Sequence, residues 1–318
     1  MTIVGGGVIG CEYASIFSTL GIEVHLIDGR DRLLPFVDGE VAGKLENHLR
    51  RLNVKFHYND QYTEVRKEPD GRLRIALKRG HVLVTDKLLY AAGRSGSVKG
   101  IGLEALGVEV NKRGQITVNE TYQTKVPNLY AAGDVVGFPA LASTSMEQGR
   151  LAMCHAFGLN YKQKMAQHLP YGIYTVPEIS MAGMTEEEAK EKGVDYEVGR
   201  HSYGQNARGQ IIGDYEGMIK LVFRADNQEL LGIHVIGELA AELVQVGLGC
   251  LFYKGTIDFF IQSVFNFPTL SEGYKYAAYD GLGRLARRKA FMGDAAPKPP
   301  PVSSPRELGE TDPGRPRN

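Results

Sequence analysis

GGGVIG, residues 5–10, has the spacing G-x-G-x-x-G and directly follows the apolar pair Ile3-Val4. In such a turn Gly5 ends a strand tightly, Gly7 lets a pyrophosphate approach the backbone, and Gly10 brings the next helix close to the sheet. The amino terminus of that helix offers free N–H groups and a partial positive charge to phosphates. The stretch therefore predicts a dinucleotide-binding unit, and the alternative is a glycine-rich turn of an ordinary α/β domain.

The residues after the turn extend this interpretation. A strand expected at 22–27 ends in Asp28, about twenty residues after the turn, where a carboxylate accepts hydrogen bonds from a ribose 2′-hydroxyl. Arg30 and Arg32 follow, and charge-assisted hydrogen bonds from them would offset the repulsion between Asp28 and a 2′-phosphate. The sequence thus predicts binding of NAD and tolerance of NADP, unless both arginines are simply solvated.

Composition excludes several classes of protein. The 318 residues leave room for two domains, and Lys+Arg and Asp+Glu both number 37, so no basic excess points to nucleic acid or an anionic membrane. Three isolated cysteines fit a reducing cytoplasm, and the eight histidines show no metal-binding spacing, so no metal site is expected. The longest uncharged apolar-rich run, 243–253, is too short to span a bilayer. No signal peptide is recognised, and the abrupt first strand predicts either an early-starting domain or the C-terminal part of a longer protein.

The order of elements predicts an α/β fold. Strands at 1–4, 22–27 and 54–56 alternate with helices to about Leu20 and over 38–52, which implies a right-handed parallel sheet. An antiparallel hairpin is expected at 62–66 and 73–77, followed by a returning strand at 87–91. Further elements are expected as short strands at 116–118 and 129–132 and a helix at 142–157.

The chain changes character after Gln167. A capping box at Thr185 to Glu188 opens a short helix, and strands at 196–202, 218–223 and 230–236 are separated by turn residues. A helix over 238–253 and a last helix opened by Pro268 complete an α+β pattern. The tail holds seven of the fourteen prolines and almost no large apolar residue, so it is expected to be disordered.

Four stretches together resemble one known superfamily. They are GGGVIG with Glu12, AAGR at 91–94, the eleven residues 124–134, and FPTLSE at 267–272. In this order they resemble the flavoprotein disulfide reductases over nearly all of residues 1–290. GCEYAS at 10–15 and DRLL at 31–34 are most similar to the soluble, FAD-dependent pyridine nucleotide transhydrogenases within it.

This resemblance implies a domain organisation and an activity. It places a Rossmann-like NAD(P)-binding domain at 1–93, the C-terminal part of an FAD-binding domain at 94–167, an α+β dimerisation domain at 168–290 and the proline-rich tail at 291–318. The implied protein is a cytoplasmic homodimer that transfers hydride from NADPH to NAD⁺ through FAD.

The resemblance also assigns roles to individual residues. Asp134, delivered with Gly133 by the 129–132 strand, would bind the FAD ribitol, and the backbone near Ala142 would face the flavin. Gly93 would join the cofactor-binding residues Gly5, Gly7, Gly10, Asp28 and Arg30. Glu12 would lie near the nicotinamide, and Glu272 is the glutamate of the dimerisation domain. The alternatives are that Asp134 is a turn or cap residue and that Glu12 is a solvated or salt-bridged helix residue.

Two departures from the family pattern qualify the expected activity. No second G-x-G-x-x-G is present, so we expect the isolated chain to dimerise and bind pyridine nucleotide weakly, without tightly held flavin or turnover. Disulfide-reducing relatives carry a histidine where this chain has Phe267, and a phenyl ring cannot move protons. Thiol chemistry is therefore disfavoured. The alternatives are a dihydrolipoamide-dehydrogenase-like flavoprotein and a non-catalytic nucleotide-binding or dimerising remnant.

Overall fold

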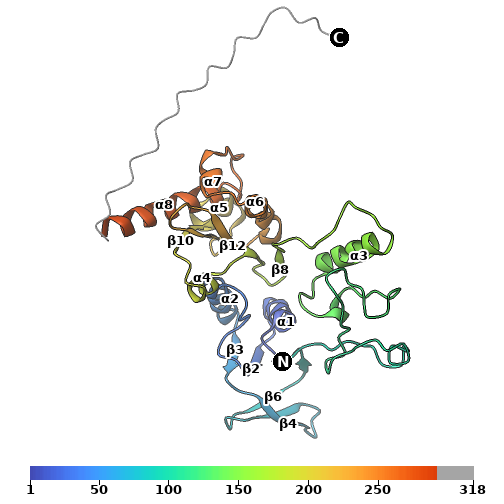
Figure 1. The fold of residues 1–318 in the computed structure, drawn as a ribbon. Helices are drawn as coiled ribbons and strands as arrows, with labels where there is room; N and C mark the ends of the chain where they lie inside the picture. Colours follow the sequence, from blue (N-terminus) through green and yellow to red (C-terminus); the bar gives the residue numbers. More distant parts are fainter. Residues whose placement is uncertain (292–318) are drawn as a thin grey trace, which may run out of the picture.

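The fold is built from two sheet-containing units joined by an irregular stretch (Figure 1). It is seen in a computed structural model that describes residues 1–291. We call residues 1–93 the parallel-sheet unit, 94–167 the connecting unit and 168–291 the antiparallel-sheet unit. The expectation of disorder for 291–318 lies outside the described residues, apart from Phe291 at the end of the last helix.

The parallel-sheet unit confirms the predicted β-α-β-α-β order. Its sheet has the strand order β3-β2-β1-β7, and all neighbouring strands are parallel. The elements are β1 (Thr2–Val4), α1 (Val8–Thr19), β2 (Val24–Asp28), α2 (Gly39–Arg51), β3 (Val54–Tyr58) and β7 (Leu88–Tyr90).

Helix α2 shows how the local sequence sets these elements. The side chain of Asp38 caps the helix, since its Oδ1 accepts hydrogen bonds from the backbone N–H groups of Glu40 (3.1 Å) and Val41 (3.4 Å). Val41, Leu45 and Leu49 recur at helical spacing and are fully buried. One face of α2 therefore packs into the core, and its first residue is defined by a charged cap.

The predicted hairpin is confirmed and gains a third strand. β4 (Tyr62–Lys67), β5 (Leu73–Leu77) and β6 (Val82–Thr85) form an antiparallel sheet of their own. The sequence analysis missed β6. It returns along β5 through a turn at Gly80, whose φ of +89° favours glycine.

The connecting unit corrects two predictions. Its regular elements are the 3₁₀-helix η1 (Asp134–Val136) and α3 (Ala142–Ala156), which confirms the predicted helix. The strands expected at 116–118 and 129–132 are wrong, since each contributes only an isolated bridge, Val110 to Ile116 and Gln123 to Tyr130. The reason is that their backbone groups bond to turns and to η1 instead of a neighbouring strand, as in Ile116 N to Val135 O of η1 at 2.8 Å.

The antiparallel-sheet unit has five strands in the order β10-β11-β12-β9-β8. Helices α6 and α8 pack on this sheet, and α4 begins with the predicted capping box. The elements are β8 (Tyr171–Ile173), β9 (Ile179–Gly183), α4 (Glu186–Glu191), β10 (Tyr196–Ser202), the 3₁₀-helix η2 (Tyr203–Gln205), α5 (Ala207–Ile212), β11 (Met218–Arg224), β12 (Leu230–Ile236), α6 (Ala240–Phe252), α7 (Asp258–Gln262) and α8 (Gly273–Phe291).

Two features of this unit differ from the sequence analysis. The short helices α5 and α7 were missed, and α8 begins at Gly273 and not near Pro268. Before Gly273 the backbone makes turns, with Gly273 N bonding to Leu270 O at 3.0 Å, and the Thr269 hydroxyl accepts a hydrogen bond from Glu272 N at 3.4 Å. Residues 268–272 are therefore an ordered lead into the helix.

The two sheet-containing units share one hydrophobic core. Ile179, Met218 and Ile236 of the antiparallel-sheet unit are buried in the same cluster as Leu26 and Leu45 of the parallel-sheet unit. Contacts across this boundary exclude water from both sides, so it resembles the interior of a domain. The position of the glycine turn therefore depends on residues more than 150 positions away.

Candidate nucleotide-binding cleft

The glycine turn has the geometry that its spacing predicts. Gly5 has φ +109°, and its N–H donates to Ile27 O at 2.8 Å. A Cβ on Gly5 would lie 2.6 Å from the carbonyl oxygen of Ala91, and a Cβ on Gly10 would lie 1.8 Å from the carbonyl oxygen of Gly5. A Cβ on Gly7 would meet nothing within 4 Å. Two glycines are thus required by packing, while the third borders open space.

That open space is a cleft of about 770 Å³ at the carboxyl ends of the parallel strands. Its walls are the glycine turn, the ends of β2 and β7, residues 60–62, Ala140 and Leu141 ahead of α3, and Tyr171. Ligands of open α/β sheets bind at this edge, and the volume lies within the range of small-molecule sites. The cleft lies between the parallel-sheet unit and the start of α3.

Asp28 lies at the end of β2, as predicted, but its carboxylate is already engaged. Its oxygens accept hydrogen bonds from Arg30 Nε (2.8 Å), Arg30 Nη2 (2.7 Å), Arg30 N (2.8 Å) and the N–H of Gly6. Burial would raise the pKa of Asp28, but these hydrogen bonds outweigh it and hold the pKa below its ordinary value. A ribose hydroxyl that binds Asp28 must therefore replace a bond from Arg30.

The two arginines after Asp28 have different surroundings. Arg30 lines the cleft, and nearly half of its side chain is exposed beside the Asp28 carboxylate. Arg32 turns away, since its guanidinium donates to Pro35 O and lies 3.8 Å from Glu187 Oε1 in the antiparallel-sheet unit. Of these two arginines, Arg30 lines the cleft and Arg32 does not.

The opposite side of the cleft carries the residues expected to contact flavin. Gly93 and Arg94 line it, and Arg94 Nη1 forms an ion pair with Asp134 Oδ2 at 2.7 Å. Gly133 has φ +87°, and its N–H donates to Gln148 Oε1 at 2.7 Å. Ala142 is the first residue of α3, a helix that begins without a side-chain cap. Asp134 and Ala142 thus lie next to residues that line the cleft, Arg94 and Leu141, but are not among the lining residues themselves.

The two glutamates singled out from the sequence lie outside the residues that line this cleft. Glu12 Oε1 accepts a hydrogen bond from the backbone N–H of Tyr174 at 2.9 Å, which ties α1 to the antiparallel-sheet unit. Glu272 is only 8% exposed, and burial raises its pKa. It borders a separate cavity of about 460 Å³ together with Phe267, whose ring is exposed. The proposed roles of both glutamates remain predictions.

Sequence reasoning missed several residues that line the cleft. Asp60, Gln61 and Tyr62 follow β3, while Tyr90 ends β7. These residues could have been predicted from the sequence, because residues at the carboxyl end of a parallel strand lie at the edge of the sheet where ligands bind. Tyr171 gave no such signal, since it comes from β8 of the other unit.

Within residues 1–291 no group of three or more histidine, cysteine, aspartate or glutamate side chains is placed to hold a metal ion. Over the same residues, no helix combines the length and the apolar character needed to cross a membrane.

Fold and cleft together are those of an α/β protein with a glycine turn at the ligand edge of a parallel sheet and a second, antiparallel-sheet unit. Residues 1–149 match the family model described as pyridine nucleotide-disulphide oxidoreductase, and residues 169–278 match the dimerisation domain of the same family. The chain belongs to the pyridine nucleotide-disulphide oxidoreductases, which confirms the predicted superfamily and the α/β fold class with its C-terminal α+β unit.

Similar proteins narrow the comparison. The soluble pyridine nucleotide transhydrogenase of Azotobacter vinelandii is 45% identical over 288 residues, covering 90% of this chain and 62% of that protein. The transhydrogenase of Pseudomonas putida is 43% identical with the same coverage. The chain thus spans about three fifths of the length of these curated relatives.

Solved structures agree on the fold. LpdA from Mycobacterium tuberculosis superposes with a TM-score of 0.80 at 26% identity, over 87% of this chain and 60% of that one. The HOCl-induced flavoprotein disulfide reductase RclA from Escherichia coli gives a TM-score of 0.82 at 25% identity, over 87% and 64%.

Proposed function

We propose that this chain forms the pyridine-nucleotide-binding and dimerising parts of a cytoplasmic, FAD-dependent transhydrogenase that catalyses NADPH + NAD⁺ → NADP⁺ + NADH. The observation that carries the proposal is the cleft, where an open Gly7, a helix amino terminus and the Asp28–Arg30 pair meet. The curated relatives are named soluble pyridine nucleotide transhydrogenases, and this name supports both the proposed reaction and a protein that is not embedded in a membrane. Bound FAD would accept a hydride from one nicotinamide and deliver it to the other.

The residues beside the cleft fit part of an FAD site. Asp134 presents a half-exposed carboxylate, and the first N–H groups of α3 lack a side-chain cap. In our proposal Asp134 holds the ribitol hydroxyls, and the amino terminus of α3 stabilises negative charge on the flavin ring. These residues orient the flavin, and no acid or base from this chain is needed for hydride transfer.

The exposed surface of the connecting unit supports the proposal that another part of the protein packs against it. Several large apolar side chains are exposed on it: Phe138, Met146, Phe157 and Tyr161. Exposed apolar side chains gathered on one unit mark an interaction surface. We propose that the remaining part of an FAD-binding domain covers them.

The antiparallel-sheet unit supports homodimer formation. Large apolar side chains on and around α6–α8 are exposed, including Phe252, Tyr253, Val264, Phe267 and Tyr279. The match of residues 169–278 to a dimerisation domain supports our proposal that a second copy of the chain covers these side chains. The domain division at 93 and 167 remains a part of this proposal.

Purified residues 1–318 should sediment as a dimer, bind NADH weakly and lack visible flavin absorbance. A chimera that adds the part of the Azotobacter vinelandii enzyme not spanned by this chain should be yellow and reduce thio-NAD⁺ with NADPH. The same chimera should not reduce a disulfide substrate, because Phe267 cannot transfer protons.

Three outcomes would contradict these expectations. Stoichiometric FAD and turnover in the isolated chain would mean that these residues hold a complete site. A flavin-loaded chimera without transhydrogenase activity would overturn the proposed reaction. Reduction of a disulfide at roughly 10 s⁻¹, a rate typical of enzymes, would favour the dihydrolipoamide-dehydrogenase-like alternative.

Arg30→Ala should weaken NADPH binding more than NADH binding. Arg30 is the cleft-facing cation beside Asp28, and hydrogen bonds to charged groups contribute about 1.5–3 kcal/mol, which corresponds to roughly 10- to 100-fold in affinity. NADH has no 2′-phosphate, so it loses no contact with Arg30. The freed Asp28 carboxylate can accept hydrogen bonds from its ribose hydroxyls. Fluorescence titration of both nucleotides, with Arg30→Lys as the charge-conserving control, measures the difference. Equal losses for both nucleotides would contradict the assignment.

A further inference from the structure

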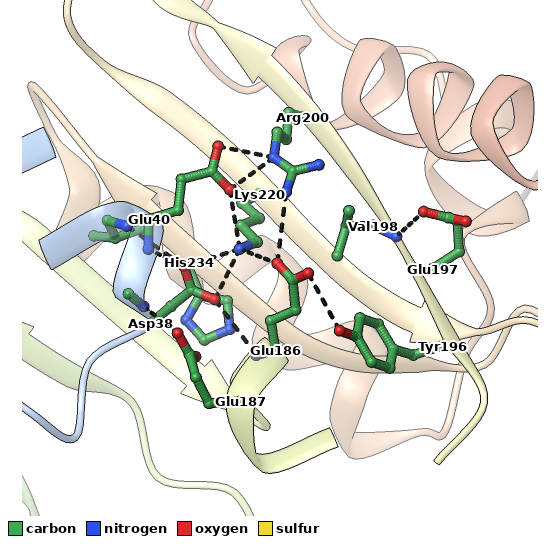
Figure 2. Close-up of polar contacts among 12 residues, drawn as sticks. Asp38, Glu40, Glu186, Glu187, Tyr196, Glu197, Val198, Arg200, Lys220 and His234 are labelled. Carbon is green, nitrogen blue, oxygen red and sulfur yellow. Dashed lines mark hydrogen bonds and ion pairs between the residues drawn. The ribbon is translucent and has the colours of Figure 1, made fainter. Parts of the chain in front are cut away.

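A cluster of charges around a buried Lys220–Asp38 pair lies where the two sheet-containing units meet (Figure 2). At its centre is Lys220 of β11, whose side chain is 1% exposed. Its Nζ lies 2.9 Å from both carboxylate oxygens of Asp38, 3.0 Å from Glu40 Oε2 and 2.6 Å from Glu186 Oε2. One cation of the antiparallel-sheet unit thus gathers two carboxylates of the parallel-sheet unit and one of its own.

A second cation completes the cluster. Arg200 Nε lies 2.8 and 2.7 Å from the two carboxylate oxygens of Glu40, and Arg200 Nη2 lies 3.5 Å from Glu186 Oε2. The hydroxyl of Tyr196 donates to Glu186 Oε1 at 3.2 Å. Buried ion pairs add little net stability, because desolvation opposes their attraction, but their bond directions are specific.

Asp38 connects this cluster to the nucleotide cleft. It caps α2 and follows segment 29–37, which lies directly against the glycine turn. Leu34 N donates to Gly6 O at 3.1 Å, and a Cβ on Gly6 would lie 2.9 Å from Leu33 Cδ2. The same segment carries Arg30. Lys220 therefore holds one end of the segment whose other end forms the wall of the cleft.

The shared apolar core does not supply the same restraint. Leu33, Leu34 and Val37 of segment 29–38 are buried in this core, but burial of apolar side chains is non-directional, so it does not set the direction of the bonds at Asp38. The bonds from Lys220 to Asp38 have fixed lengths and angles. A shift of the cap would pass along a short, tightly packed segment to Gly6.

We propose that Lys220 is a positioning residue for nucleotide binding, which acts from the antiparallel-sheet unit through Asp38 and segment 29–38 on the glycine turn. The inference rests on the proposed binding of pyridine nucleotides at the cleft. It makes affinity in one unit depend on a lysine in the other.

The test compares Lys220→Met, Lys220→Met/Asp38→Asn and Ile233→Val in the full chain. The Asp38→Asn change keeps a capping oxygen without a buried unpaired charge, so the double variant should regain thermal stability. Its affinity for NADH should nevertheless stay roughly 2- to 30-fold weaker, the usual range of coupling between connected sites. Ile233→Val trims the core of the antiparallel-sheet unit and should leave affinity unchanged.

A second measurement needs no ligand. Amide hydrogen exchange of the nucleotide-free chain should be faster at Gly6 and Leu34 in the double variant and unchanged there in Ile233→Val. If affinity and exchange recover together with stability, Lys220 is only structural and the inference is overturned. If the unaltered chain fails to bind NADH, the proposed function is wrong. In that case the inference is tested by hydrogen exchange alone, and it is overturned if the double variant exchanges at Gly6 and Leu34 as the unaltered chain does.

Discussion

Gly10→Ala is expected to disrupt the glycine turn and abolish NADH binding. The new Cβ would lie 1.8 Å from the carbonyl oxygen of Gly5, a backbone atom that has no rotamer to relieve the clash. Gly5 cannot shift freely, because its N–H bonds to Ile27 O and its own Cα lies against the backbone of Ala91. Forcing atoms into a packed site costs about 1–3 kcal/mol or more. Thermal unfolding and NADH titration of the purified variant check both effects.

Gly7→Ala is the matched control, for which we expect a loss of NADH affinity with almost no loss of stability. Its Cβ would meet no atom within 4 Å, and Gly7 has φ −82°, which alanine adopts without strain. Stability should change by about 0.5 kcal/mol or less, as for exposed substitutions. The methyl group nevertheless enters the space proposed for the pyrophosphate, so NADH affinity should fall about tenfold or more. Normal NADH binding by Gly7→Ala would place the phosphates elsewhere, and a stable, fully binding Gly10→Ala would refute the packing argument.

Lys220→Met should lower the free energy of unfolding by about 3–5 kcal/mol, the usual effect of removing one partner from a buried ion pair. The variant leaves Asp38 fully buried without its closest cation. Asp38→Asn in the same chain should recover much of the loss, because it removes the uncompensated charge. Urea unfolding of the single and double variants measures both quantities, and a loss below about 1 kcal/mol for Lys220→Met would contradict the expectation.

The effect of Lys220→Met should shrink as the pH falls. In the native protein burial would raise the pKa of Asp38, but nearby His234 and Lys220 lower it below the ordinary value of 3.8. The stability contributed by this pairing is therefore present above pH 3.8 and is lost as the pH falls through the lowered pKa. Without Lys220, fewer groups oppose the effect of burial, so the pKa of Asp38 should be higher than in the native protein, and protonation then relieves the unpaired charge. The two unfolding curves should therefore converge in acid.

Local patterns suffice for some elements of the fold and fail for others. The glycine spacing and the Thr185 capping box were readable from the sequence, because each depends on residues within a few positions of one another. The apolar segments 116–118 and 129–132 were wrongly predicted as strands, since a strand exists only where a second strand pairs with it. Periodicity describes one side of that pairing.

The candidate site divides in the same way. The sequence by itself determined the glycine turn, the acidic residue at the end of β2 and the family, because these follow from short-range geometry and ordered motifs. Only the tertiary structure showed that the Arg30 guanidinium donates hydrogen bonds to the Asp28 carboxylate, whereas Arg32 lies towards Glu187. It alone paired Lys220 with Asp38, 182 positions apart. The physical reason is that a side chain's charge is fixed by its chemistry, whereas its partner is fixed by which distant backbone the core brings beside it.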